Sequence, residues 1–252
     1  MIDLISSSKT RIQTGLSILV FVLFLAWINS FFIMWIFFGV LLLVSTQEAM
    51  RLYKFKDFNP YFYLVPFWIV AFFYPEPQEL SFLAILIAAS ILAYKNSKDT
   101  KIFLILLYPL VPYLFLLSLY EIFGLRALLW LLVLVVCADA GAYFVGKSIG
   151  STQFCKTSPN KTLEGLAGGL VIATIVGAFF SVHGLGVFAS LFISFCVALG
   201  SVFGDLFESY LKRIAGVKDS GDILPGHGGI LDRLDGYLFA SIVMLVLLKA
   251  FV

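Results

Sequence analysis

The chain has 252 residues, of which 61% are hydrophobic and only 13% are charged. Soluble domains contain about 25% charged residues, so this composition excludes a soluble globular protein and indicates a polytopic membrane protein. The net charge of +2 excludes no class of partner by itself. The three cysteines (Cys137, Cys155 and Cys196) have no CxxC spacing and therefore indicate neither a disulfide framework nor a zinc site.

Nine apolar segments are candidates for membrane-spanning helices, since a span needs about 20 mostly apolar residues. We expect an all-α polytopic bundle with about nine transmembrane helices. Residues 1–124 are expected to form a lipid-facing scaffold, and residues 125–252 a catalytic region with a loop at 211–235. The expected spans lie near residues 12–28, 30–47, 60–75, 79–94, 102–120, 125–146, 165–182, 185–210 and 236–252.

The positive charges fall on one side of these spans. With nine spans, 15 of the 17 Lys and Arg lie in connections on the side of the N-terminus, and only Arg126 and Lys249 fall outside. Cytoplasmic connections carry an excess of Lys and Arg, so we expect the N-terminus and the 211–235 loop in the cytoplasm and the C-terminus outside. The basic and aromatic connection at 51–58 fits such anchoring, and attraction for anionic lipid is the alternative.

Charge is dense in one stretch, residues 204–236, between two apolar segments. If its first part is helical, Asp205, Glu208, Ser209 and Lys212 share one face. Carboxylate oxygens are natural Mg²⁺ ligands, and Mg²⁺ commonly combines one or two carboxylates with substrate phosphates. Lys, Arg and glycine-rich backbone would bind the remaining phosphate charge. A loop that only fixes topology is the alternative, but acids contribute little to orientation.

Asp139 lies inside the expected sixth span. An ionisable residue within a span is costly and is by default a candidate for a functional site. Tyr143, Gly146 and Gly150 follow it at helical spacing on the same face. Close helix packing, with Asp139 paired to a neighbour, is the alternative.

The segment KTSPNKTLEGLAGG at 156–169 contains a second group of candidates. Its Ser-Pro pair predicts a turn, and Thr162 or Thr157 is expected to cap the next helix, with Glu164 in the first turn. Lys156, Lys161 and the helix N-terminus are together suited to bind an anion. Capping alone explains the hydroxyls and the acid, but it does not explain the clustered lysines.

The polar stretch resembles the signature of the phosphatidate cytidylyltransferase family, also called CDP-diacylglycerol synthases. That signature consists of Ser, Lys-Arg, Lys-Asp, His-Gly-Gly and Asp-Arg-x-Asp at fixed spacing, and every defined position is present here. The segments DAGAYFVGKSIG, SPNKTLEG and GDLFES also resemble the family, with departures at Asn160 and Leu163. The matching positions of the signature are Ser209, Lys212, Arg213, Lys218, Asp219, His227, Gly228, Gly229, Asp232, Arg233 and Asp235.

The resemblance implies an integral membrane enzyme that joins CTP and phosphatidic acid into CDP-diacylglycerol and releases pyrophosphate. It implies a Mg²⁺ requirement in a two-metal centre whose second metal is an ion such as K⁺, with Asp205 and Asp232 as bridging carboxylates. It also implies a homodimer in membrane lipid and no nucleic-acid partner. The expected location is the bacterial inner membrane, with the active site on the cytoplasmic side.

The resemblance and the patterns above predict two sets of site residues. The catalytic set is Asp205, Ser209, Lys212, Arg213, Asp219, His227, Asp232 and Asp235. The substrate-binding set is Asp139, Lys147, Ser158, Lys161, Thr162, Glu164, Lys218, Gly228, Gly229 and Arg233.

Two other classes of function remain open at this point. A second kind of enzyme would keep CTP and change the acceptor, as in a polyprenol or phytol kinase or a cytidylyltransferase of ether lipids. An ion-coupled transporter would use Asp139 and Asp205 as an intramembrane ion site. The transporter predicts an inverted repeat between the two halves, which the sequence does not show, and gives the His-Gly-Gly and Asp-Arg-x-Asp residues no role.

Overall fold

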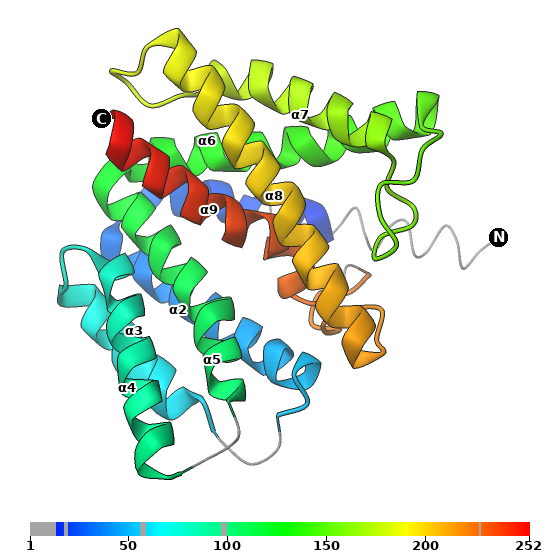
Figure 1. Ribbon diagram of the computed structural model, residues 1–252. Helices are drawn as coiled ribbons and strands as arrows, with labels where there is room; N and C mark the ends of the chain where they lie inside the picture. Colours follow the sequence, from blue (N-terminus) through cyan, green and yellow to red (C-terminus); the bar gives the residue numbers. More distant parts are fainter. Residues whose placement is uncertain (1–13, 18–19, 56–58, 97–99, 227) are drawn as a thin grey trace. The chain divides into compact units, whose positions relative to one another are not determined.

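The computed structural model describes residues 14–17, 20–55, 59–96, 100–226 and 228–252. This part of the chain is helical and contains no strand, only two isolated bridges (Figure 1), which confirms the all-α class. Residues 14–17 and 20–28 are helical. The elements that follow are α2 (Phe31–Leu52), α3 (Tyr61–Phe73), η1 (Pro77–Glu79), α4 (Leu80–Tyr94), α5 (Lys101–Ile105), η2 (Leu106–Leu110), α6 (Val111–Ile149), α7 (Leu163–Ala178), α8 (Val187–Ala215) and α9 (Leu231–Phe251).

Five helical segments are long and apolar enough to cross a membrane: Phe31–Leu52, Pro77–Tyr94, Lys101–Ile149, Val187–Ala215 and Leu231–Phe251. The helices α3 and α7 are apolar but shorter. The described helices coincide with the expected segments to within a few residues, and the expected first span lies partly outside the described residues. These apolar helices are those of an integral membrane protein.

The longest helical run, Lys101–Ile149, is interrupted twice. Tyr108 has φ −149 and ψ 107 ahead of Pro109, whose nitrogen cannot donate the helical hydrogen bond. Gly124 has φ 70 and ψ −171, in a region that favours glycine. The second break separates the two apolar segments that the sequence places near 102–120 and 125–146.

The polar stretch is more helical than the sequence suggests. Helix α8 ends at Ala215 and α9 begins at Leu231, so the connection is residues 216–230 rather than the expected 211–235. Hydropathy places the end of α8 too early and the start of α9 too late, because polar side chains on one face do not prevent a helix. Asp232 lies in the first turn of α9, where a negative charge is favoured by the helix dipole.

The chain forms two compact units. The first consists of Met1–Leu117 and Ile214–Arg233. In it, α2 packs against α3, and α3 packs against α4. Its core is a set of fully buried apolar side chains, namely Leu42, Leu64, Ile105, Leu106, Leu110, Leu114 and Leu117.

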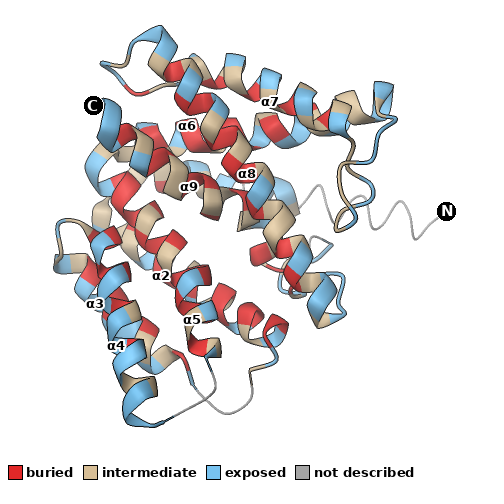
Figure 2. Cartoon of the chain, in the orientation of Figure 1, coloured by how far each residue is buried: buried red, intermediate tan, exposed pale blue. Residues whose placement is uncertain are grey.

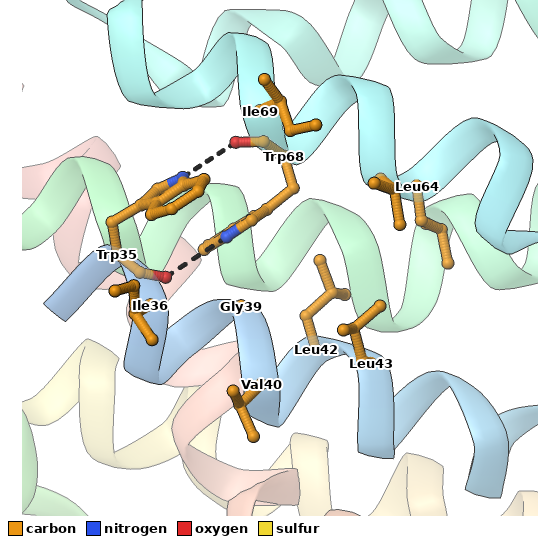
Figure 3. A pocket seen from close by; sticks show the side chains of 10 residues that line it. Trp35, Ile36, Gly39, Val40, Leu42, Leu43, Leu64, Trp68 and Ile69 are labelled. Atoms are coloured by element: carbon orange, nitrogen blue, oxygen red, sulfur yellow. Dashed lines mark hydrogen bonds between the residues drawn. The ribbon is translucent and has the colours of Figure 1, made fainter. Parts of the chain in front are cut away.

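Trp35 and Trp68 join α2 to α3 in the first unit (Figure 3). Each indole N–H donates to the backbone oxygen of the other residue, at 2.9 and 3.2 Å, and the rings stack with centroids 6.5 Å apart. A Cβ atom at Gly39 would collide with the Trp68 indole, so only glycine permits this approach. The two helices line an open apolar pocket of about 210 Å³.

The second unit consists of Ser118–Arg213 and Leu234–Val252. Helix α7 buries one face, formed mainly by small residues, and exposes the other (Figure 2). A Cβ atom at Gly165 would lie 2.7 Å from the backbone oxygen of Ala142, and one at Gly169 would lie 2.5 Å from that of Ala138. Helices α6 and α7 therefore approach at backbone contact, as small residues in membrane helices allow.

Candidate active site

A cleft of about 430 Å³ in the second unit gathers predicted site residues from three segments. Helix α6 contributes Asp139 and Lys147, the chain ahead of α7 contributes Lys161 and Thr162, and α8 contributes Asp205. Apolar side chains complete the walls. The cleft therefore combines acids and cations on a largely apolar background, which suits a ligand with both charged and uncharged parts.

Lys161 and Asp205 form an ion pair through the ammonium group and Oδ2. The Ser209 hydroxyl donates to Oδ1 of the same carboxylate at 3.3 Å. The side chains of Lys161 and Asp205 are 34% and 28% exposed, so the pair can be reached from solvent. An entering anion would be attracted by Lys161, and an entering cation would compete with Lys161 for Asp205.

The loop ahead of α7 holds Lys161 in place. Thr162 caps the helix, as predicted, by accepting a hydrogen bond from the Gly165 N–H at 3.1 Å. The backbone N–H of Phe154 donates to the Lys161 oxygen at 2.8 Å, and the N–H of Lys161 donates to the Ser158 oxygen at 3.1 Å. Ser158 thus forms the turn predicted from its Ser-Pro pair.

Glu164 fastens the end of α6 to the start of α7. Its carboxylate accepts from the Ser151 N–H and hydroxyl at 3.1 and 2.9 Å and from the Thr152 N–H at 3.2 Å. Hydrogen bonds from its own backbone N–H and from Thr152 lower the pKa of Glu164 to about 2. The carboxylate is therefore ionised at neutral pH, and its hydrogen bonds to Ser151 and Thr152 order the loop that holds Lys161.

A second polar group joins α8 to α9. Glu208 is fully buried, and Lys212 donates to its Oε2 at 2.9 Å. Asp235 of α9 interacts with Glu208 and, electrostatically, with Asp205 and Lys212. The sequence predicts that Asp205, Glu208, Ser209 and Lys212 share a face, and the contacts confirm it. Glu208 was absent from the predicted site residues, although the structure places it beside Asp235.

Asp232, in the first turn of α9, binds residues of the connection that precedes this helix in the first unit. Its Oδ2 accepts from the Ser220 N–H at 2.8 Å, the Ser220 hydroxyl at 3.0 Å and the Gly229 N–H at 2.8 Å. Gly228 has φ 83, and a Cβ atom there would lie 2.8 Å from the same oxygen. The first glycine of the Gly-Gly pair is thus required by the close approach of the backbone to Asp232.

Glu48 is a second residue, besides Glu208, that the predicted site residues do not include. It lies near the end of α2, is 1% exposed, and accepts from the Ile230 and Leu231 N–H groups at 2.9 and 2.8 Å. The Ser220 hydroxyl lies 3.1 Å from its Oε2. No sequence motif includes Glu48; its only signal is a carboxylate at the end of an apolar segment.

The other predicted residues lie at the surface. Arg213, Lys218, Asp219 and Arg233 are exposed, and Lys147 lies 5.7 Å from the centre of the Tyr143 ring. Asp219 lies beside Gly228. His227 falls outside the described residues.

The oxygen donors at Asp205 and Asp232 suit a hard divalent cation by their chemistry. Among the described residues, no three His, Cys, Asp or Glu side chains converge on one point. Mg²⁺ bound by one or two carboxylates completes its shell with water and substrate phosphates. Each of these carboxylates is therefore of the chemical type that binds Mg²⁺ together with a nucleotide.

Comparison with known proteins agrees with this chemistry. The model of the cytidylyltransferase family matches residues 9–251. The phosphatidate cytidylyltransferases of Helicobacter pylori strains 26695 and J99 are 43% and 44% identical over 243 residues, which cover 95% of this chain and 91% of each relative. That of Bacillus subtilis strain 168 is 45% identical over 133 residues, or 51% of this chain and 49% of the relative. The chain therefore belongs to the cytidylyltransferase family, as the signature between Ser209 and Asp235 predicts.

Proposed function

We propose that this protein transfers the cytidylyl group of CTP to phosphatidic acid, giving CDP-diacylglycerol and pyrophosphate. The observation that best supports the proposal is the Lys161–Asp205 pair at the cleft, in a chain closely related to phosphatidate cytidylyltransferases. Asp205 belongs to the α8 polar stripe, and Lys161 to the second segment that resembles the family. Residues of two independent family segments thus meet at one cleft.

The chain's own residues answer the first difficulty of this reaction, which is the repulsion between two polyanions. An oxygen of the phosphatidate phosphate attacks the α-phosphorus of CTP, and the bond from that phosphorus to the oxygen bridging the β-phosphate breaks. Pyrophosphate leaves with the bonding electrons. Because the attacking oxygen is already ionised near neutral pH, no strong general base is needed. Lys147 and Lys161 neutralise phosphate charge at the cleft, and Lys212 does so at the end of α8.

Asp205 and Asp232 are the residues that would hold Mg²⁺, with a second ion such as K⁺ in the same centre. When bound, the metal neutralises phosphate charge and aligns an in-line displacement. One electrostatic interaction and one sequence spacing support this assignment. Asp235 interacts electrostatically with Asp205, and Asp235 lies three residues from Asp232 on α9.

The proposed arrangement in the membrane has nine spans, with the N-terminus and the 216–230 connection in the cytoplasm. It is supported by the break at Gly124, which divides the longest run, and by the short apolar helices α3 and α7. We place the protein in the bacterial inner membrane as a homodimer, with phosphatidate tails in the bilayer and the head group facing CTP. Residues 125–252 form the catalytic region in this proposal, and every residue that lines the cleft belongs to it.

The test is pyrophosphate release by the purified protein in detergent micelles or vesicles. We expect release only when CTP, phosphatidate and Mg²⁺ are all present. Replacement of phosphatidate by polyprenol, phytol or an ether-linked phosphatidate measures the alternative acceptors. Release without phosphatidate, or full activity in excess chelator, would contradict the proposal.

A further inference from the structure

The carboxylate of Glu48 is enclosed by a segment about 180 positions away in sequence. Its Oε1 accepts from the Ile230 N–H, and its Oε2 accepts from the Leu231 N–H, in the last loop residue and first residue of α9. A buried carboxylate is costly unless it is hydrogen-bonded, and donors at a helix N-terminus stabilise its charge. Glu48 therefore fixes the point at which α9 begins.

Two glycines show how closely the loop wraps around this carboxylate. A Cβ atom at Gly229 would lie 2.6 Å from both carboxylate oxygens of Glu48. One at Gly221 would lie 2.5 Å from Oε1. Any side chain at either position would push the loop off Glu48, so the second glycine of the His-Gly-Gly motif is matched to a residue of α2.

Ser220 links Glu48 to Asp232. Its hydroxyl lies 3.1 Å from Oε2 of Glu48 and 3.0 Å from Oδ2 of Asp232. A hydroxyl has one proton and can donate to only one of the two carboxylates at a time. The Asp232 carboxylate is therefore coupled to Glu48 through a shared donor as well as through the backbone of residues 229–231.

We propose that Glu48 is a positioning residue for cytidylyl transfer. Its carboxylate holds residues 220–221 and 229–231 in the conformation that presents Asp232 to the metal and the nucleotide phosphates. This inference rests on the proposed function, because it assigns Asp232 a place in that reaction. It gives the N-terminal half of the chain a direct part in the geometry of the site.

The most informative variant is Glu48→Gln. An amide has one oxygen, so whichever way it is oriented, an NH₂ group faces the N–H of Ile230 or of Leu231. Hydrogen–deuterium exchange of the peptide covering residues 216–231 should become at least about tenfold faster, while peptides of α7 keep the wild-type rate. The Mg²⁺ concentration for half-maximal activity should rise about tenfold or more. A purely structural role would reduce the amount of active enzyme without moving that concentration.

Three further variants keep the test decisive. Glu48→Asp retains the charge and should recover part of the wild-type Mg²⁺ response. Gly229→Ala should reproduce the Glu48→Gln phenotype from the other side of the contact. Thr46→Val is the matched control, because Thr46 is also buried in α2 but donates only to the Leu42 oxygen of its own helix, at 2.7 Å.

The outcomes distinguish a failure of the proposed function from a failure of the inference about Glu48. Wild-type protein without phosphatidate-dependent activity would overturn the proposed function, and the role assigned to Glu48 with it. An active wild type with unchanged exchange and Mg²⁺ response in both Glu48→Gln and Gly229→Ala would overturn the inference alone. The same changes in Thr46→Val would also overturn it, since they would follow from any altered polar group in α2.

Discussion

The ammonium group of Lys161 is paired with the carboxylate of Asp205, 44 positions later in the sequence. Lys161 precedes α7, and Asp205 lies within α8, so the pair joins two helices at the cleft. A pair that is about one-third exposed contributes little to stability, in the range of 0–1 kcal/mol. We therefore assign the pair a role in binding: Lys161 would attract the phosphates of a metal–nucleotide complex, and Asp205 its metal ion.

The first prediction concerns Lys161. Replacement by Gln should lower kcat/KM for CTP about ten- to hundredfold, because a charge-assisted contact to phosphate contributes roughly 1.5–3 kcal/mol. The matched control is Lys156→Gln, at an exposed position of the same loop that does not line the cleft. Steady-state kinetics at saturating phosphatidate measure both. Equal effects of the two variants on kcat/KM would contradict a direct contact between Lys161 and the CTP phosphates.

Asp205→Asn and Asp232→Asn should each abolish turnover and leave the protein folded. Both changes remove a negative charge that Mg²⁺ needs while preserving side-chain volume. Asp222→Asn is the control, since the Asp222 side chain is 96% exposed in the 216–230 connection, between the two helices, and lies 3.9 Å from Arg51. The measurement is the rate of pyrophosphate release by each variant over a range of Mg²⁺ concentrations. Substantial activity in either variant would remove that residue from the metal site.

Sequence periodicity predicts the α8 side of the site well. Helical spacing places Asp205 and Ser209 on one face, and their contact at 3.3 Å follows from it. Local capping rules likewise predict Thr162 at the start of α7. These features depend on residues within a few positions of one another, which is the range over which helix geometry is fixed.

Contacts between distant segments could not be predicted in this way. Glu48 accepts from a backbone N–H 183 positions later, and no periodicity relates the two. The start of α9 at Leu231 was also missed, because hydropathy treats the polar first turn as loop. The Leu231 N–H, at the start of that turn, donates to Glu48, which lies in another part of the chain.

Lys212 and Arg213 should behave differently because adjacent helical residues point about 100° apart. Lys212 neutralises buried Glu208, whereas Arg213 is exposed. We expect Lys212→Ala to raise the half-saturating CTP concentration and Arg213→Ala that of phosphatidate, each about ten- to hundredfold. Lys212→Ala should also lower the melting temperature, since it leaves a buried acid without its cation. Saturation curves for CTP and for phosphatidate, measured for each variant, test this prediction. A shift in the CTP curve alone for both variants would refute the assignment of different substrates to Lys212 and Arg213.

The topology can be tested with single cysteines in a variant that lacks the three native ones. A cysteine at Val217, which is 42% exposed in the 216–230 connection, should react with an impermeant thiol reagent only after the cells are opened. A cysteine at Val252, 72% exposed at the C-terminus, should react in intact cells. The physical reason is the concentration of Lys and Arg on the side of the connection. Labelling at Val217 from outside would invert the proposed orientation.

The central claim is tested most directly by following the phosphates of CTP. With CTP labelled at the α-phosphate, the account predicts that label enters the lipid fraction as CDP-diacylglycerol, in equal amount to the pyrophosphate released. With CTP labelled at the γ-phosphate, all label should appear in pyrophosphate and none in lipid. Transfer of the γ-label to lipid would identify a CTP-dependent kinase and contradict the account.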